Sequence, residues 1–194
     1  MINMHLILSS TDFNSPVVRE AIINELPKPV EDCTVLFFPS EKASNKDVKS
    51  AKFKKWLEGF GFTRANVTVF NKNTPEKYIG LTVDAVYVGG GNTFAMLKIM
   101  RDTGFDRELI RLVENGALYI GGSAGAHIAS KNIEHVQVFD SNDVGLTDFS
   151  GLGFFDGILF CHFCEERVPY YEKVLAEGKY RAYTLNDDEY LVQK

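Results

Sequence analysis

The fold is decided by one stretch of the chain, Ala117-Leu118-Tyr119-Ile120-Gly121-Gly122-Ser123-Ala124-Gly125-Ala126. Its first four residues form a short apolar run bounded by glycines, which is typical of a buried strand. The chain then turns through Gly-x-Ser-x-Gly, and the residues that follow can continue as a helix. This context is that of a nucleophile elbow, in which Ser123 would project its hydroxyl into a cleft from a sharp strand-to-helix turn. The alternative is a glycine-rich turn that merely packs tightly, because the motif also recurs by chance.

Strands and helices alternate along the remaining sequence. Apolar runs that indicate strands cover residues 6–8, 35–38, 66–70, 84–88, 117–120, 158–161, 182–185 and 190–193. Amphipathic spacing predicts helices over residues 17–26, 47–60, 106–114 and 165–176, and another one that carries Phe94, Leu97 and Met100. Continuous apolar strands separated by amphipathic helices predict an α/β fold with a mostly parallel sheet covered on both faces.

The two glycine-rich turns of the chain both follow predicted strands. One is Gly89-Gly90-Gly91-Asn92-Thr93 and the other contains Ser123. Ligands of open parallel sheets bind outside the carboxyl ends of the strands. This placement favours a functional role for Ser123.

Three further segments complete the expected organisation. The aromatic stripe of helix 47–60 is expected to be core, and its members are Phe53, Trp56, Leu57 and Phe60. Residues 132–155 are rich in Asp, Asn and Gly and are expected to hold short strands and loops. The last two strands flank an acidic turn at residues 186–189. With 194 residues and no linker or repeat, the chain fits one domain.

Composition excludes several classes of function. The net charge is −5 and no basic stripe carries interleaved aromatic residues, so nucleic acid is not an expected partner. No apolar run approaches the roughly 18 residues that span a bilayer. The first eight residues, which include Met1, lack the basic and apolar regions of a signal peptide. We expect a cytoplasmic protein that does not bind membranes.

The cysteines give little support to a metal or redox site. There are three, an odd number that suits a reducing compartment. Cys161-His162-Phe163-Cys164 is formally a CxxC motif, but the remaining Cys33 stands far away and supplies no second ligand pair. The motif also lies late in the chain, whereas a thioredoxin-type pair opens a helix near the start of its domain. We therefore expect no metal and no cofactor.

A serine hydroxyl needs a base, and four histidines are available. His5 lies in the first strand, His135 in a polar loop, and His127 follows Ser123 in the same helix, where it is poorly aimed at the serine oxygen. Only His162 falls at the carboxyl end of a predicted strand. We favour His162 as the base; the alternative is a structural polar group.

The base needs an acid to orient it, and the acidic turn near the C-terminus offers two. Asp187 and Asp188 both follow the predicted strand 182–185. The alternative is a solvated acidic hairpin without a catalytic role. The glycine-rich turn at Gly89–Thr93 lacks the lysine of a P-loop, so it is better suited to an oxyanion hole, with N–H donors from Gly91 and Ala124.

The two glycine-rich motifs resemble those of the aspartyl dipeptidase (dipeptidase E) and cyanophycinase family of serine peptidases. The resemblance spans most of the chain and is strongest from residue 85 to residue 129. It implies a three-layer α/β/α sandwich related to class I glutamine amidotransferases. It also implies a triad of Ser123, His162 and an acid that aligns with Asp187, where the dipeptidase has Glu. The oxyanion donors again fall on Gly91 and Ala124.

The chain departs from this family after His162. In the dipeptidase a longer segment carries an arginine that binds the substrate's aspartate side chain. That segment is shortened here, the aligned position is Cys164, and Arg167 matches a later arginine. The resemblance therefore implies hydrolysis of peptide bonds more strongly than it implies a preference for N-terminal aspartate. We assign Gly90, Asn92 and Arg167 to substrate binding.

Together these features predict a serine hydrolase that acts on short peptides. One alternative is a non-catalytic binding or regulatory domain on the same scaffold, which the shortened segment would favour. Another is an esterase or amidase that acts on small molecules. The sequence does not distinguish a monomer from a homodimer.

Overall fold

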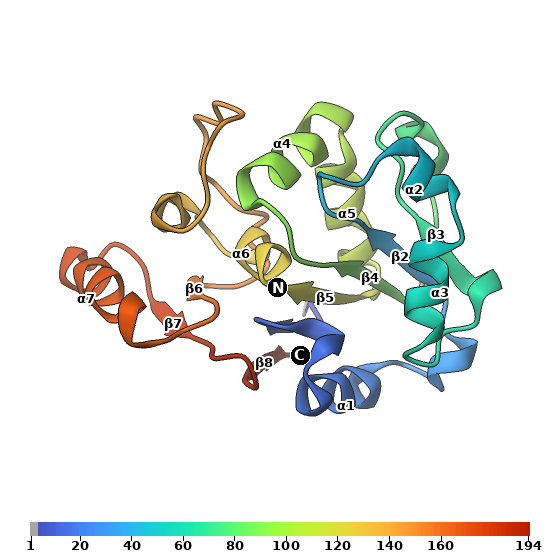
Figure 1. Ribbon diagram of the computed structural model, residues 1–194, viewed down its shortest axis with the longest axis horizontal. Helices are drawn as coiled ribbons and strands as arrows, with labels where there is room; N and C mark the ends of the chain where they lie inside the picture. Colours follow the sequence, from blue (N-terminus) through green and yellow to red (C-terminus); the bar gives the residue numbers. More distant parts are fainter. Residues whose placement is uncertain (1–3) are drawn as a thin grey trace.

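The computed structural model describes residues 4–194, and its centre is a six-stranded sheet with the order β3-β2-β4-β5-β1-β8. The strands pair in parallel, except that β8 runs antiparallel to β1 at one edge. A separate pair, β6 and β7, lies to one side of this sheet (Figure 1). The strand bounds are β1 Leu6–Ser9, β2 Val35–Phe38, β3 Val67–Val69, β4 Ala85–Val88, β5 Leu118–Gly122, β6 Ile158–Phe160, β7 Ala182–Thr184 and β8 Tyr190–Gln193. The expectation for the first eight residues lies partly outside the described residues, which begin at Met4.

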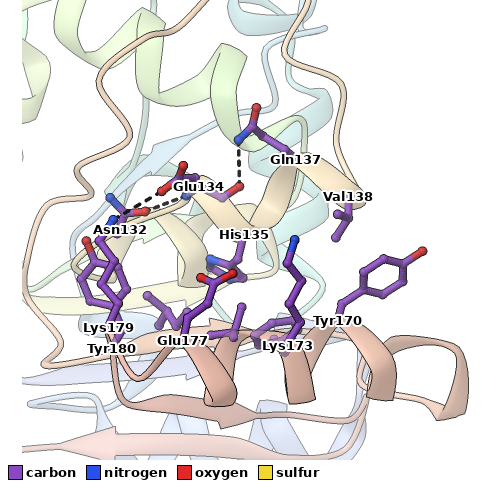
Figure 2. Close-up of a pocket in the computed structure, with 13 residues that line it drawn as sticks. Asn132, Glu134, His135, Gln137, Val138, Tyr170, Lys173, Glu177, Lys179 and Tyr180 are labelled. Carbon is purple, nitrogen blue, oxygen red and sulfur yellow. Dashed lines mark hydrogen bonds and ion pairs between the residues drawn. The ribbon is translucent and has the colours of Figure 1, made fainter.

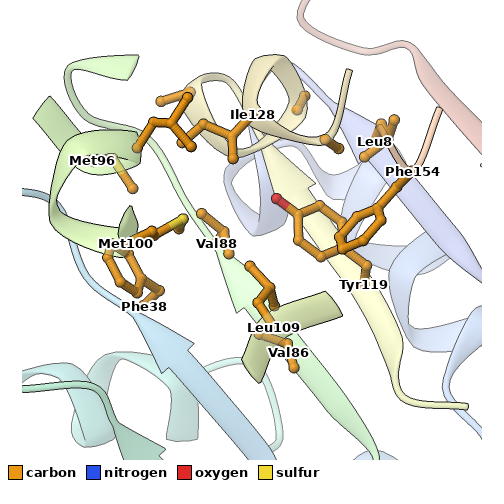
Figure 3. Close-up of a cluster of buried hydrophobic side chains, with 14 of the residues drawn as sticks. Leu8, Phe38, Val86, Val88, Met96, Met100, Leu109, Tyr119, Ile128 and Phe154 are labelled. Atoms are coloured by element: carbon orange, nitrogen blue, oxygen red, sulfur yellow. The ribbon is translucent and has the colours of Figure 1, made fainter. Parts of the chain in front are cut away.

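Helices cover both faces of the sheet. The α-helices are α1 Pro16–Glu25, α2 Asn45–Lys49, α3 Lys52–Glu58, α4 Thr93–Thr103, α5 Phe105–Glu114, α6 Ala124–Ala129 and α7 Val168–Glu177. Short 3-10 helices are η1 Asp12–Asn14, η2 Val30–Asp32, η3 Arg64–Asn66, η4 Pro75–Tyr78, η5 Glu134–Val138 and η6 Glu165–Arg167. One buried cluster joins the sheet to α4, α5 and α6 (Figure 3), and a second joins the opposite face to α1 and α3. The predicted three-layer α/β/α arrangement is confirmed. Among residues 4–194 no helix is both long and apolar enough to cross a membrane.

The predicted single helix over residues 47–60 is wrong. The segment forms two helices, α2 and α3, because Ser50 leaves helical geometry with φ −75° and ψ 165°. Its hydroxyl donates to the carbonyl of Asp47 at 2.6 Å, and such local side-chain bonds compete with helix continuation. Of the predicted core stripe only Leu57 is fully buried, while the three aromatic side chains are partly exposed against the cluster.

The acidic turn is not a hairpin. Strand β7 pairs in parallel with β6, whereas β8 pairs antiparallel with β1, so the turn carries the chain from the small sheet to the large one. The strands expected within residues 132–155 are also absent from that segment, all of which the structure describes. It holds η5 and an isolated bridge between Asn132 and Ser150.

Strand β5 lies between β4 and β1, and this register places Ser123 at the centre of the sheet's carboxyl edge. Gly121 pairs with Val88 on one side and with Leu8 on the other. Helix α6 then returns so closely over β4 that a Cβ on Gly125 would lie 2.0 Å from the carbonyl oxygen of Val88. Only glycine allows this close packing of helix on strand.

Asp12 fills the space behind the elbow. Its side chain is buried, and a Cβ on Gly122 would lie 1.1 Å from its Oδ1. Oδ2 accepts a hydrogen bond from the Tyr87 hydroxyl at 2.9 Å, while the buried Oδ1 has no partner among the described residues. Burial raises the pKa of Asp12 from 3.8 to about 7, because a carboxylate in an apolar interior loses its hydration. Its φ of +54° is also unusual for a non-glycine residue.

The Asp12→Asn variant should become more stable than the natural chain as pH rises. The folded protein holds the Asp12 proton more tightly than the unfolded chain does. Its stabilising effect is therefore complete below pH 3.8 and is lost as pH rises through about 7. The pKa difference corresponds to at most about 4 kcal/mol. Asn keeps the volume, tolerates the left-handed φ and does not titrate. Urea unfolding at pH 4 and pH 8 measures the free energy of unfolding of the variant and of the natural chain. A difference between the two that does not grow from pH 4 to pH 8 would contradict the prediction. An equal growth for the exposed control Asp143→Asn would contradict it as well.

Candidate active site

Ser123 occupies the turn between β5 and α6 in a strained conformation, with φ +48° and ψ −107°. Its amide donates to the carbonyl of Ser9 at 2.8 Å, and its own carbonyl accepts from the amide of His127 at 3.0 Å. The flanking residues Gly122 and Ala124 are buried, whereas Ser123 is partly exposed. The turn therefore presents the hydroxyl at the edge of the sheet while the backbone around it is fixed.

His162 follows β6 and faces Ser123. Its Nε2 lies 3.0 Å from the Ser123 Oγ. The histidine also has a left-handed backbone, with φ +51°. Its amide donates to the Ser10 Oγ at 2.9 Å, and the next amide, that of Phe163, donates to the carbonyl of Leu185 at 2.9 Å. His162 is thus held through both its imidazole ring and its backbone.

Asp187 stands on the far side of the imidazole. Its Oδ1 lies 2.6 Å from His162 Nδ1. Asp188 turns the other way: its Oδ1 accepts from the Ser15 hydroxyl at 2.8 Å, at the start of α1. Of the two acids that the sequence left open, Asp187 is the one that contacts the histidine.

The three side chains form one continuous hydrogen-bonded series. With Nδ1 of His162 protonated and donating to the Asp187 carboxylate, Nε2 is left to accept the proton of the Ser123 hydroxyl. This tautomer is the one that can remove a proton from an attacking hydroxyl, and the distances lie within hydrogen-bonding reach.

The glycine-rich turn after β4 lies beside Ser123. A Cβ on Gly90 would be 3.9 Å from the Ser123 Cβ, and one on Gly91 would lie 2.5 Å from both Glu41 Oε2 and Met96 Sδ. The turn therefore lies beside the elbow at Gly90, and at Gly91 it packs against the ends of the Glu41 and Met96 side chains. Ala124, the other predicted oxyanion donor, is the first residue of α6.

Asn92 is engaged by the chain itself. Its Oδ1 accepts from the Ala95 amide at 2.9 Å and caps α4, and its Nδ2 donates to the carbonyl of Ser141 at 2.8 Å. Its amide donates to Glu41 Oε2 at 2.9 Å, and the next amide, that of Thr93, donates to Asp140 Oδ2 at 2.8 Å. Two carboxylates therefore accept hydrogen bonds from the amides at the start of α4, where the dipole of a helix favours negative charge.

Arg167 is likewise bound within the protein. Its Nη1 donates to the carbonyl of Cys161 at 2.6 Å, and its guanidinium lies 4.0 Å from the centre of the Phe139 ring. Cys161 immediately precedes His162. These contacts connect Arg167 to the backbone of the histidine, while its predicted contact with substrate stays a prediction.

The other histidines lie away from the Ser123 hydroxyl. His5 pairs with Glu25 at 2.7 Å. His127 is buried, which lowers its pKa well below the usual value, and its Nδ1 lies 3.4 Å from Thr93 Oγ1. His135 is in η5 rather than in the expected loop; its Nε2 donates to the carbonyl of Leu159 at 2.7 Å, and burial lowers its pKa to about 4.

The two cysteines of the CxxC motif differ in environment. Cys161 is buried beneath the elbow, with Sγ 3.7 Å from the Ser123 carbonyl oxygen, and burial raises the pKa of its thiol to about 12. Cys164 is exposed. No cluster of three or more metal-ligating side chains occurs among residues 4–194.

Residues at the end of β1 and in the loop after it, which were not predicted as part of the site, support it. Ser9 holds the elbow, Ser10 holds His162 and donates to the carbonyl of Leu185 at 2.9 Å, and Thr11 donates to the carbonyl of Asp187 at 2.5 Å. The run Ser9-Ser10-Thr11 directly after a buried strand was the available signal, because such a run lies at the carboxyl edge of the sheet.

Comparison with known proteins identifies a family and several relatives that this chain resembles. The family described as Peptidase family S51 matches residues 5–194. An uncharacterized peptidase of Listeria monocytogenes is 31% identical over 181 residues, which cover 87% of this chain and 85% of that relative. Peptidase E of Citrobacter koseri is 41% identical over 83 residues, or 41% of this chain and 34% of that protein.

A solved structure shows the same fold over nearly the whole chain. It is the crystal structure of a protein of Listeria monocytogenes EGD-e provisionally described as peptidase E, with a TM-score of 0.74 and 28% identity, covering 98% of this chain and 94% of the other. Since the family match covers far more than half of the sequence, the chain belongs to peptidase family S51 and is a serine peptidase.

Proposed function

We propose that the chain hydrolyses short peptides with Ser123 as nucleophile, His162 as general base and Asp187 as the acid that orients the base. The observation that carries this proposal is the series of contacts from Ser123 Oγ to His162 Nε2 at 3.0 Å and from His162 Nδ1 to Asp187 at 2.6 Å. The alternative of a non-catalytic binding domain gives no functional reason for two residues with positive φ in this alignment. The cost of such backbone conformations, roughly 1–3 kcal/mol each, is usually found where function requires it.

The reaction follows from the protonation states of this series. Ser123 Oγ attacks the peptide carbonyl as its proton passes to His162 Nε2, and Asp187 stabilises the resulting imidazolium. The oxyanion of the tetrahedral intermediate accepts hydrogen bonds from the amides of Ala124 and Gly91, each such donor contributing about 3 kcal/mol. His162 then delivers the proton to the leaving amine. Water activated by His162 releases the acyl group from Ser123.

The contacts of the site do not favour an N-terminal aspartate as the preferred substrate residue. Arg167 is bound to the Cys161 carbonyl, and the carboxylates of Glu41 and Asp140 lie at the start of α4 beside the glycine-rich turn. Like charges would disfavour a carboxylate near that turn. We therefore confine the proposal to short peptides. An ester substrate would use the same nucleophile, and the same assays report it.

Ser123→Ala should abolish labelling by a small serine-reactive phosphonate. It should also lower peptide hydrolysis by about 10⁵- to 10⁶-fold, as loss of a catalytic serine does elsewhere. Mass spectrometry of the labelled protein and a dipeptide panel with acidic, basic and neutral N-termini measure both effects. Ser141→Ala, in an exposed loop, is the control and should label normally. Labelling that survives in a folded Ser123→Ala protein would refute the assignment.

Asp187→Asn and Asp188→Asn should differ strongly. Asp187→Asn removes the carboxylate that fixes the histidine tautomer and should lower kcat by up to about 10⁴-fold. Asp188→Asn removes a charge from a side chain that contacts Ser15 and not His162, and it should leave kcat within about twofold of the natural value. Steady-state kinetics of both variants on one dipeptide decide between the two acids. Equal losses would contradict the role given to Asp187.

Arg167 acts as a positioning residue for His162 under this proposal. Arg167→Met should lower kcat about 10- to 100-fold with little change in KM, because small displacements of a catalytic group have effects of this size. Arg167→Lys should restore part of kcat. Arg101→Met is the matched control, since Arg101 also donates to backbone carbonyls, those of Asp148 and Ser150. A rise in KM at unchanged kcat would instead support the substrate-binding role expected from the sequence.

A further inference from the structure

A cavity lies beside β6, the strand that ends two residues before His162. It has a volume of about 490 Å³ and separates η5 from α7 above β6 (Figure 2). This volume is within the range of about 300–1,000 Å³ that is usual for small-molecule sites. Ser123, His162 and Asp187 are not among its lining residues. The cavity exists because α7 does not close onto η5, and α7 contributes no fully buried residue to the fold.

One part of the lining is apolar. Its side chains are Val138, Ile158, Phe160, Tyr170, Val174 and Tyr180. Phe160 is fully buried, and its ring centre lies 4.8 Å from that of His135, which also lines the cavity. The cavity therefore offers a ligand apolar and aromatic contact at the level of β6.

The other part of the lining carries charges of both signs. Lys173 and Glu177 project from consecutive turns of α7 toward η5 (Figure 2). Neither makes an ion pair or a side-chain hydrogen bond with the part of the chain that the structure describes. By contrast, Glu134 and Lys179 pair with each other at 3.6 Å. The mouth of the cavity thus presents one ammonium and one carboxylate, both exposed to solvent and without a partner among the described residues.

We propose that this cavity binds a short zwitterionic peptide, with its carboxylate at Lys173 and its ammonium group at Glu177. A ligand with a single charge would leave the opposite wall charge unmatched. Residues four apart on a helix have Cβ atoms about 5–6 Å apart, and the ends of an extended dipeptide are about 7 Å apart. That the natural ligand is a peptide rests on the proposed hydrolysis, whose substrates and products carry both charges.

A ligand in this cavity would contact the strand that positions the base. Phe160 lies two residues before His162, and His135 donates to the carbonyl of Leu159 at 2.7 Å. Arg167 at the start of α7 donates to the carbonyl of Cys161. Occupancy would therefore act on the segment that carries His162 through η5, α7 and β6.

Binding of glycyl-L-phenylalanine to the Ser123→Ala protein tests the proposal. Backbone amide NMR shifts are followed during titration, with N-acetyl-glycyl-L-phenylalanine amide, which lacks both charges, as the second probe. We expect the zwitterion to shift amides of η5, β6 and α7, and the uncharged probe to bind there at least tenfold more weakly. The variant Lys173→Met/Glu177→Gln should lose these shifts. The matched control is Lys98→Met/Asp102→Asn, an exposed pair on α4 at the same spacing, which should retain them.

The opposite results would overturn the proposal. These are shifts confined to the surroundings of residue 123, equal binding of the uncharged probe, or shifts unaffected by the change at Lys173 and Glu177. Because binding is measured in a protein without the nucleophile, the result is independent of hydrolysis. Phosphonate labelling of the natural chain tests the proposed function separately.

Discussion

The site depends on two adjacent residues at the end of β1. The carbonyl of Ser9 accepts the amide of Ser123, and the hydroxyl of Ser10 accepts the amide of His162 while donating to the carbonyl of Leu185. The proposed nucleophile, the proposed base and the segment that leads to Asp187 come from three separate parts of the chain. Ser9, the last residue of β1, and Ser10 directly after it hold all three. The rigid core around β1 and β5 therefore sets the distances on which proton transfer depends.

Backbone strain is concentrated around this point. Within residues 4–194 the non-glycine residues with left-handed φ are Asp12, Ser123 and His162. Two of them belong to the proposed triad, and the third packs its carboxyl group against Gly122. Such conformations persist only when the surrounding structure enforces them. Here the enforcement comes from the buried strands on either side of β5 and from the close approach of α6 at Gly125.

The sequence was informative where the signals were local. Buried strands, glycine turns and the strand-end position of His162 follow from apolar runs and from the rule that parallel sheets form sites at one edge. Asp187 and Asp188 could not be separated, because adjacent residues differ only in direction, and the direction is set by contacts with Ser15 and His162. The helix over residues 47–60 is interrupted at Ser50 by a hydrogen bond of one hydroxyl. Strands β7 and β8 pair separately because their partners, β6 and β1, lie elsewhere in the chain. Asn92 contacts Glu41 and Ser141, each roughly 50 residues away in the chain, and Arg167 lies over the Phe139 ring, roughly 30 residues away; spacing does not reveal these contacts.

The order of the elements along the chain has a consequence for protein synthesis. The elbow is complete once α6 has formed, but His162 and Asp187 come later, and β8 must pair with β1 before the acidic turn is anchored at both ends. A nascent chain that has left the ribosome only as far as α6 thus carries an unactivated serine. Under the proposed triad, hydrolytic capacity would arise only late in translation, when the antiparallel edge strand β8 pairs with β1.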